Sequence, residues 1–344
     1  MIEVIIKEAD SRQRIDKYII KLLPGASKSL IYKQIRKKNI TLNGKKISGS
    51  EILSAGDGIQ FFFSNETYDK FSNSYDDSTI NELYNNALDA YNSRSDVHIV
   101  YEDNNIACVN KPDNFLSQMA DSKSYSLNEW FTGYLISKGI SNKDTLSHFK
   151  PSVLNRLDKN TTGMVICSKS LLGANVISEL IRDRSLEKSY LTVVAGTFNK
   201  DGEYTAYHHK DETNNMVTIK GKAEDYKPGT TYSQIVTGIR KVATYKTYSI
   251  GAISLLEIEL ITGKSHQIRA HLAYLGYPVL GDTKYGNNKI NSKLKEIGIK
   301  HQMLHSYKIK MPNSLPEGME ALNQKEIICN PPDNWRKLNV NLEI

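Results

Sequence analysis

The sequence predicts an α+β fold with a mainly antiparallel mixed sheet, preceded by a small basic α/β module. Three observations support this prediction. The chain has 344 residues, more than one small domain usually contains. From residue 98 onward, strand-like and helix-like segments mix without a regular β-α-β rhythm. Positive charge is concentrated before residue 64 and is followed by an acidic, polar stretch.

The composition is that of a globular protein with an excess of positive charge. Hydrophobic residues make up 39% of the chain and charged residues 24%, which is enough to bury a sizeable core. The formal net charge of +7 favours a polyanionic partner. We expect no signal peptide, because the first ten residues carry acids and only a short apolar run, and we expect no membrane-spanning segment.

The three cysteines, Cys108, Cys167 and Cys329, are widely spaced. Cys108 and Cys167 lie in apolar runs, so we expect small buried side chains in a reducing cytoplasm. No spacing of Cys and His is typical of a zinc site, and we predict no metal.

Residues 1–63 predict the basic module. They contain twelve Lys and Arg against six Asp and Glu. Ser27 can cap a helix over K-S-L-I-Y-K-Q-I-R-K-K-N, and Asn43-Gly44 between alternating apolar arms predicts a two-residue hairpin turn. The later A-G-D-G-I-Q-F-F-F predicts a further turn and strand.

The basic side chains of this module have two interpretations. Each lysine taken singly is typical of a solvated helix face. The order of helix, hairpin and strand, all of them basic, favours RNA binding instead and resembles the S4-like RNA-binding domain over residues 12–63. The candidate RNA-binding residues in it are Arg14, Lys28, Lys33, Arg36, Lys37 and Lys45.

Residues 64–97 predict an acidic polar linker. They contain seven Asp and Glu against two basic residues and are rich in Ser, Asn and Tyr. Such a composition buries little apolar surface, although N-E-L-Y-N-N-A-L-D-A-Y predicts a helical piece. We therefore expect the basic module to be tethered to the larger domain that begins at residue 98.

The elements predicted after residue 97 agree with the apolar pattern of the sequence. Residues 98–112 predict two strands joined by a D-N-N turn and ended by Pro112. Strands are also predicted at residues 164–168, in K-S-Y-L-T-V-V-A-G and in S-L-L-E-I-E-L-I-T-G. Helices are predicted in L-L-G-A-N-V-I-S-E-L-I and in H-Q-I-R-A-H-L-A-Y-L-G, which Gly276 closes.

Asp158 stands in V-L-N-R-L-D-K-N-T-T-G, just before a predicted strand. An isolated Asp before Thr-Thr-Gly is by default a turn former. Arg156 lies two residues earlier and shares a face with Asp158 if the segment is extended. A carboxylate beside a fixed guanidinium stays ionised and oriented, as a nucleophile or a base requires.

Two further segments carry groups that suit chemistry. Tyr190 lies on a predicted strand, where it is either a half-buried packing residue or a ring that stacks on a base and moves a proton. His266 and Arg269 are three residues apart and share one face of a predicted helix. His266 and His271 with Asp282 suggest a metal, but a spacing of five residues does not suit two helical ligands, so we discount it.

Together and in this order, these segments resemble the RluA family of pseudouridine synthases. The family carries a strand pair ending in N-K-P, here Asn110 to Pro112, and R-L-D-x-x-T-[ST]-G, here Arg156 to Gly163. It carries K-x-Y on a strand, here Lys188 to Tyr190, and a long motif that begins T-G-[RK]-[TS]-H-Q-I-R, here Thr262 to Gly286. The resemblance covers a catalytic domain at residues 98–310 and leaves residues 311–344 as an unmatched C-terminal extension.

The resemblance implies an enzyme that isomerises uridine in RNA to pseudouridine without a cofactor or metal. It implies that Asp158 is the essential carboxylate, which attacks the ribose anomeric carbon or removes a proton from the neighbouring carbon. Arg269 would pair with Asp158 and keep it ionised. Tyr190 would stack on the uracil and help to move the proton of carbon five, while Arg156 would lie near the vacated base stack. Since flipping a base costs least in loops, we expect a loop or partly single-stranded target.

Two positions depart from the family pattern, which usually has His before R-L-D and a small residue with Gly after N-K-P. Here Asn155 and Asp113-Asn114 stand at these places. The tethered basic domain favours large-subunit ribosomal RNA, by analogy with family members of the RluC and RluD type, with transfer RNA as an alternative. A non-catalytic RNA-binding assembly factor of the same fold is the rival class, against which the intact Asp158, Tyr190 and Arg269 argue. We expect a cytoplasmic monomer.

Overall fold

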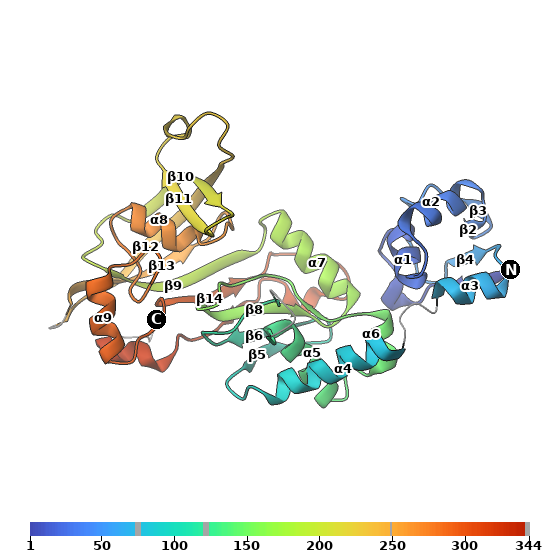
Figure 1. Cartoon of the computed structure of the whole chain (residues 1–344), viewed down its shortest axis with the longest axis horizontal. Coiled ribbons are helices and arrows are strands. Elements are labelled where there is room, and N and C mark those ends of the chain that lie inside the picture. Colours follow the sequence, from blue (N-terminus) through green and yellow to red (C-terminus); the bar gives the residue numbers. More distant parts are fainter. Residues whose placement is uncertain (73–76, 120–123, 248–249, 341–344) are drawn as a thin grey trace. The chain divides into compact units, whose positions relative to one another are not determined.

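The computed structural model describes residues 1–72, 77–119, 124–247 and 250–340. The chain forms two compact units, whose elements Figure 1 labels. The first unit contains Met1–Arg94, Asn128–Ser152 and Ser168–Asn175, and the second contains Ser95–Leu127, Val153–Cys167 and Val176–Ile344. Within the described ranges, no helix is long and apolar enough to cross a membrane.

The N-terminal part of the first unit is a four-stranded sheet of order β1-β4-β2-β3 with a shared apolar core. The predicted helix is confirmed as α2. Its predicted cap is also present, since the hydroxyl of Ser27 accepts the backbone N–H of Leu30. Asn43 and Gly44 have φ of 51° and 74°, the positive values that the predicted hairpin turn requires. The elements are β1 Ile2–Ile5, α1 Ile15–Leu22, α2 Lys28–Arg36, β2 Ile40–Leu42, β3 Lys45–Lys46, β4 Gly58–Phe61 and α3 Asn65–Ser72.

Helix α3 extends the core of this module beyond residue 63. The ring of Tyr68 meets that of Phe61 edge-on at 5.3 Å, and Phe71 meets Phe63 at 6.2 Å. The first part of the predicted linker is thus helical and supplies two aromatic side chains to the module. The proposed domain boundaries at residues 63 and 97 stay a prediction.

Three further helices lie in the first unit, apart from Leu127 at the start of α5: α4 Asp77–Asn92, α5 Leu127–Ser137 and α6 Lys143–His148. The helical piece predicted within 81–91 is part of α4. A Cβ on Gly133 would overlap the carbonyl oxygen of Ala87, so α5 and α4 approach each other backbone to backbone. The indole N–H of Trp130 donates to the carbonyl of Arg94 at 3.1 Å and fixes the end of α4.

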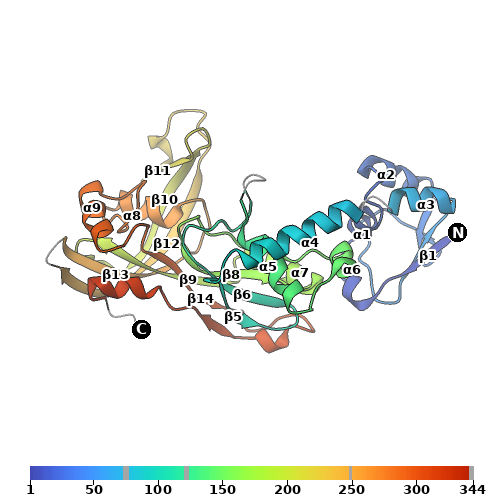
Figure 2. The ribbon, with the colours of Figure 1, turned by 60° about the horizontal axis from the view of Figure 1, so that its bottom comes forward.

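The sheet of the second unit has the strand order β11-β10-β12-β13-β9-β14-β8-β6-β5. The pairings from β11 to β14 along this path are antiparallel, as is that of β5 with β6, whereas β14 runs parallel to β8. Figure 2 shows the sheet with β10 and β11 at one end and β5 and β6 at the other. The predicted α+β class with a mainly antiparallel mixed sheet is confirmed.

The strands and helices predicted after residue 97 are present. The strands are β5 His98–Glu102, β6 Ile106–Lys111, β7 Ser152–Val153, β8 Thr162–Ser168, β9 Glu187–Ala195, β10 Gly202–Asp211, β11 Met216–Lys220, β12 Ser233–Thr247, β13 Gly251–Glu259, β14 Leu304–Lys310 and β15 Glu326–Ile328. The helices are α7 Leu171–Arg182, α8 Gln267–Tyr274 and α9 Asn288–Glu296.

Residues 311–340 are part of the second unit and not a loose appendage. Strand β15 pairs with β14, and Trp335, Leu338 and Val340 are buried in a core that also contains Leu191 and Leu255. The predicted C-terminal extension therefore completes the hydrophobic core behind the central strands.

The cysteines are buried, as predicted for Cys108 and Cys167. Burial raises the pKa of both thiols well above the ordinary value, and raises that of Cys329 to about 12. All three therefore stay protonated and unreactive at neutral pH.

Candidate active site

Asp158 lies in the turn that precedes β8. Its backbone carbonyl accepts the N–H of Thr161 at 3.0 Å, which is the turn that an Asp before Thr-Thr-Gly favours. The side chain is 28% exposed, so the carboxylate is held by the protein yet accessible.

Arg269 on α8 binds Asp158 directly. Its Nη1 donates to Oδ2 of Asp158 at 2.7 Å, so the pairing that the resemblance implies is present. The other side of the guanidinium binds Asp282, with Nε to Oδ2 at 2.6 Å and Nη2 to Oδ1 at 2.9 Å. Burial alone would lower the pKa of Arg269, but the two carboxylates raise it above the ordinary value, so the cation is permanent.

Asp282 is a buried second carboxylate behind the first. It is 0% exposed and also accepts the backbone N–H groups of Lys284 at 2.8 Å and Tyr285 at 3.1 Å. Burial alone would raise the pKa of Asp282, but the hydrogen bonds and charge of Arg269 outweigh it and the pKa is lowered. Asp282 thus fixes the guanidinium that faces Asp158.

Tyr190 lies on β9 and pairs across the sheet with Ser306 of β14. Burial raises the pKa of Tyr190 to about 12. The adjacent side chain of Ser306 acts in the opposite direction, and the charge of Asp158 adds to the rise. The phenol is therefore protonated at neutral pH and lies within electrostatic range of the carboxylate.

Gly163, the last residue of Thr-Thr-Gly, occupies a position that only glycine can fill. It has φ of 104°, and a Cβ would overlap the backbone of Ser306, its partner in the parallel pairing of β8 with β14. Only glycine permits this close approach, which brings the Asp158 turn next to the strand that carries the partner of Tyr190.

Lys111, the middle residue of N-K-P, is a buried structural cation that the sequence patterns did not assign. It is 0% exposed, and its Nζ donates to the carbonyls of Pro112 at 2.9 Å, Phe115 at 2.8 Å and Lys159 at 3.1 Å. The contact with Lys159 ties the end of β6 to the residue that follows Asp158. The N-K-P motif is the sequence signal that could have indicated this role.

Arg156 is not the arginine that holds Asp158. Its side chain is exposed and makes no ion pair among the described residues. Arg269 is the arginine that binds Asp158, and the role expected for Arg156 beside the vacated base stack stays a prediction. Asn155, where the family usually has His, binds the backbone, accepting the N–H of Ile166 at 2.7 Å.

The basic residues of the N-terminal module are mostly free to meet a polyanion. Lys28, Lys33, Arg36, Lys37 and Lys45 are all exposed. Arg14 is half exposed but is ion-paired with Asp16 at 2.9 Å, and the hydroxyl of Tyr32 also donates to Asp16. Their role in RNA binding stays a prediction.

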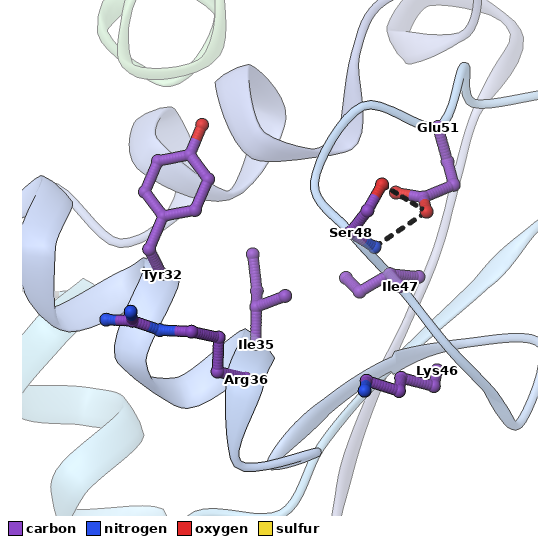
Figure 3. A pocket seen from close by; sticks show the side chains of 7 residues that line it. All are labelled: Tyr32, Ile35, Arg36, Lys46, Ile47, Ser48 and Glu51. Carbon is purple, nitrogen blue, oxygen red and sulfur yellow. Dashed lines mark hydrogen bonds between the residues drawn. The ribbon is translucent and has the colours of Figure 1, made fainter.

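A shallow pocket lies on the same module. Its volume is about 430 Å³, and its lining, drawn in Figure 3, includes the basic side chains of Arg36 and Lys46 and the apolar side chains of Ile35 and Ile47. Glu51 also lines this pocket. Its carboxylate is hydrogen-bonded to Ser48, accepting the backbone N–H at 2.7 Å and the hydroxyl at 2.8 Å, which reduces its repulsion of a bound anion.

The described residues include no group of three or more His, Cys, Asp and Glu that could hold a metal ion. His271 is buried against Thr237, with its Nδ1 at 3.0 Å from the hydroxyl. Burial lowers the pKa of His271 to about 4, so it is a neutral core residue.

Two regions of the chain match known protein families. Residues 105–274 match the profile of the RNA pseudouridylate synthase family, and residues 13–59 match that of the S4 domain. A protein of Mycoplasma genitalium named as an RNA pseudouridine synthase is 30% identical over 309 residues, which cover 90% of this chain and 88% of the relative. Ribosomal large subunit pseudouridine synthase C of Haemophilus influenzae is 26% identical and covers 93% of each chain.

A solved structure supports the fold. The human RNA pseudouridylate synthase domain containing protein 4 superposes with a TM-score of 0.56 at 19% identity, over 75% of this chain and 98% of that chain.

Proposed function

Because the chain belongs to the family of RNA pseudouridine synthases, we propose that it isomerises specific uridines of large-subunit ribosomal RNA to pseudouridine. The observation that carries this proposal is the accessible carboxylate of Asp158 on a guanidinium fixed by a second carboxylate. The likeness to the Haemophilus enzyme, which is named for the large ribosomal subunit and covers both the S4 domain and the catalytic part, supports this RNA over transfer RNA. The reaction then takes place in the cytoplasm, by a monomer.

The chemistry breaks the bond between uracil nitrogen one and the ribose and forms a bond from carbon five to the same ribose carbon. Asp158 serves this exchange as an oriented anion, either by attacking the anomeric carbon or by removing the proton of the neighbouring carbon. Arg269 holds this carboxylate in place throughout, since the guanidinium is itself held by Asp282. The hydrogen of carbon five leaves as a proton, so its release measures the reaction.

Tyr190 has two roles in the proposal. Its ring stacks on the rotated uracil, and its hydroxyl helps to move the proton of carbon five. Because burial keeps the phenol protonated, it takes part in this transfer as a hydrogen-bond donor and not as a phenolate base. Arg156 is exposed at the mouth of the turn, where it can enter the stack that the flipped base has left.

We expect Tyr190→Phe to slow turnover by about a hundredfold while RNA affinity stays within a few-fold, because the ring is kept and proton transfer is lost. Tyr274→Phe is the matched control, since this tyrosine is 51% exposed and makes no hydrogen bond among the described residues. Single-turnover release of tritium from carbon five measures both. An unchanged rate in Tyr190→Phe would mean that Tyr190 only packs or stacks.

The basic module contributes phosphate contacts in this proposal. We expect the triple change of Lys33, Arg36 and Lys37 to Gln to weaken RNA binding and to make the slope of its salt dependence shallower by up to about 2.7, since each phosphate contact adds about 0.7–0.9 to the slope. Point changes are cleaner than deletion of residues 1–63, because α3 packs on Phe61. Affinity measured over a range of salt concentrations provides the slope.

The matched control removes the same charge from α9, through Lys289, Lys293 and Lys295 to Gln, all of them exposed. Equal slopes for the two triple variants would show that the module is not part of the RNA footprint.

A further inference from the structure

His266 occupies an unusual place beside the carboxylate. It is the residue before α8 and has φ of 52° and ψ of 18°, a left-handed conformation that residues with a side chain seldom adopt. Its ring is 10% exposed, and Nε2 lies 4.0 Å from Oδ2 of Asp158. A strained backbone conformation of this kind persists mainly at functional sites, where the surrounding structure holds it in place. The hydrogen bonds of the His266 ring therefore indicate what this side chain does.

A chain of hydrogen bonds determines which ring nitrogen carries the proton. The backbone N–H of Val217 donates to the hydroxyl oxygen of Tyr285 at 3.0 Å, and the same oxygen lies 2.8 Å from Nδ1 of His266. A phenol has one proton, and Nδ1 is the sole acceptor within its reach among the described residues. The Tyr285 hydroxyl and Nδ1 are both satisfied when Tyr285 donates to Nδ1, which leaves the proton of a neutral imidazole on Nε2.

Strand β11 makes this arrangement possible. It is the edge strand of the sheet, so the outward N–H of Val217 has no neighbouring strand to pair with. The T-shaped contact of the His266 and Tyr285 rings, 5.7 Å between centroids, and the guanidinium of Arg269, 5.3 Å from the Tyr285 ring, hold the phenol in place.

Burial favours the neutral form of the imidazole, and the surrounding charges do not reverse this. Burial lowers the pKa of His266 below its ordinary value. Asp158 and Asp282 oppose this, whereas Arg269 and Lys284 act in the same direction as burial. A neutral ring that carries its proton on Nε2 presents a hydrogen-bond donor, without a charge, to Asp158.

The two oxygens of Asp158 are not equivalent. Oδ2 accepts Arg269 and is the oxygen nearest to His266, whereas Oδ1 accepts no hydrogen bond from the described residues. We propose that His266 is a positioning residue whose Nε2–H, set by Tyr285, closes on Oδ2 when RNA binds and leaves Oδ1 as the reacting oxygen. The expected effect of His266 on the reaction rate rests on the proposed function, whereas the expected tautomer does not.

The first test is the nitrogen-15 spectrum of the histidine rings at neutral pH. The wild type should show His266 with a protonated Nε2 and an unprotonated Nδ1. Tyr285→Phe should produce a mixture of tautomers, while the control Tyr274→Phe should leave the signal unchanged. A wild-type signal with the proton on Nδ1, or on both nitrogens, would overturn the proposal.

The second test compares two amides that differ in reach. His266→Gln places an N–H close to the position of Nε2, whereas His266→Asn does not reach it but suits the left-handed backbone better. We expect kcat for tritium release to fall about tenfold in the Asn variant, with KM little changed, and to recover most of that loss in the Gln variant. A merely structural role predicts the opposite order, because Asn strains the backbone less.

His98→Asn is the control, since His98 is exposed on β5. Equal rates in His266→Asn and wild type, or a faster Asn than Gln variant, would contradict the proposal. The nitrogen spectrum reports on the tautomer whether or not the wild type releases tritium, so failure of the proposed function and failure of this inference are distinguishable.

Discussion

Asp158→Asn is expected to abolish uridine isomerisation, by about a thousandfold or more, while RNA affinity stays within a few-fold of wild type. An amide of nearly the same shape fills the same turn but can neither attack the ribose nor remove its proton. Arg269 keeps Asp282 as a partner in this variant, so the fold around the site should survive. Single-turnover tritium release measures the rate, and equilibrium titration with the same RNA measures the affinity.

The control for this change is Asp333→Asn, which removes an equal charge from a carboxylate that is 94% exposed. A wild-type rate in Asp158→Asn would remove the basis of the catalytic assignment. A loss of RNA binding equal to the loss of rate would instead make Asp158 a binding residue.

Asp282→Asn is expected to destabilise the protein by about 3 kcal/mol, because it leaves the buried guanidinium of Arg269 with one carboxylate in place of two. It should also slow isomerisation strongly, since Arg269 is then free to turn away from Asp158. Urea denaturation of variant and wild type at neutral pH measures the difference in unfolding free energy.

The pH dependence of this effect follows from the lowered pKa of Asp282. A carboxyl whose pKa is lower in the folded chain stabilises the fold above its unfolded pKa of about 3.9, and loses this as pH falls through the folded value. The gap between wild type and Asp282→Asn should therefore be largest at neutral pH and shrink in acid.

Glu179→Gln is the matched control, because it breaks an ion pair with Arg182 in which both side chains are more than half exposed. A change in unfolding free energy for Asp282→Asn no larger than for this control would show that Asp282 does not anchor Arg269.

Local chemistry made several parts of this structure predictable. The cap at Ser27 and the turn at Asn43-Gly44 depend on neighbouring residues, and both are formed as predicted. Arg269 could be placed beside Asp158 because the family motif specifies that pair, although 111 positions separate the two residues.

Other features depend on contacts between distant segments and have no clear local signal. The sequence suggests Asp282 only as a discounted metal ligand, because its bond to Arg269 requires the chain to fold back after α8. A spacing of two residues brings Arg156 and Asp158 to one face only in an extended segment, and Arg269, 111 positions away, binds the carboxylate instead. The packing of Trp335 into the central core has no local signal at all.

The most direct test of the proposed reaction is tritium release from RNA that carries the label at carbon five of uridine. Large-subunit ribosomal RNA, assembling large-subunit particles and transfer RNA are offered separately to wild type and to Asp158→Asn. We expect release by wild type from the large-subunit RNA or its particle and none by the variant. Release from transfer RNA alone would contradict the proposed substrate, and no release from any of the three would contradict the proposed reaction.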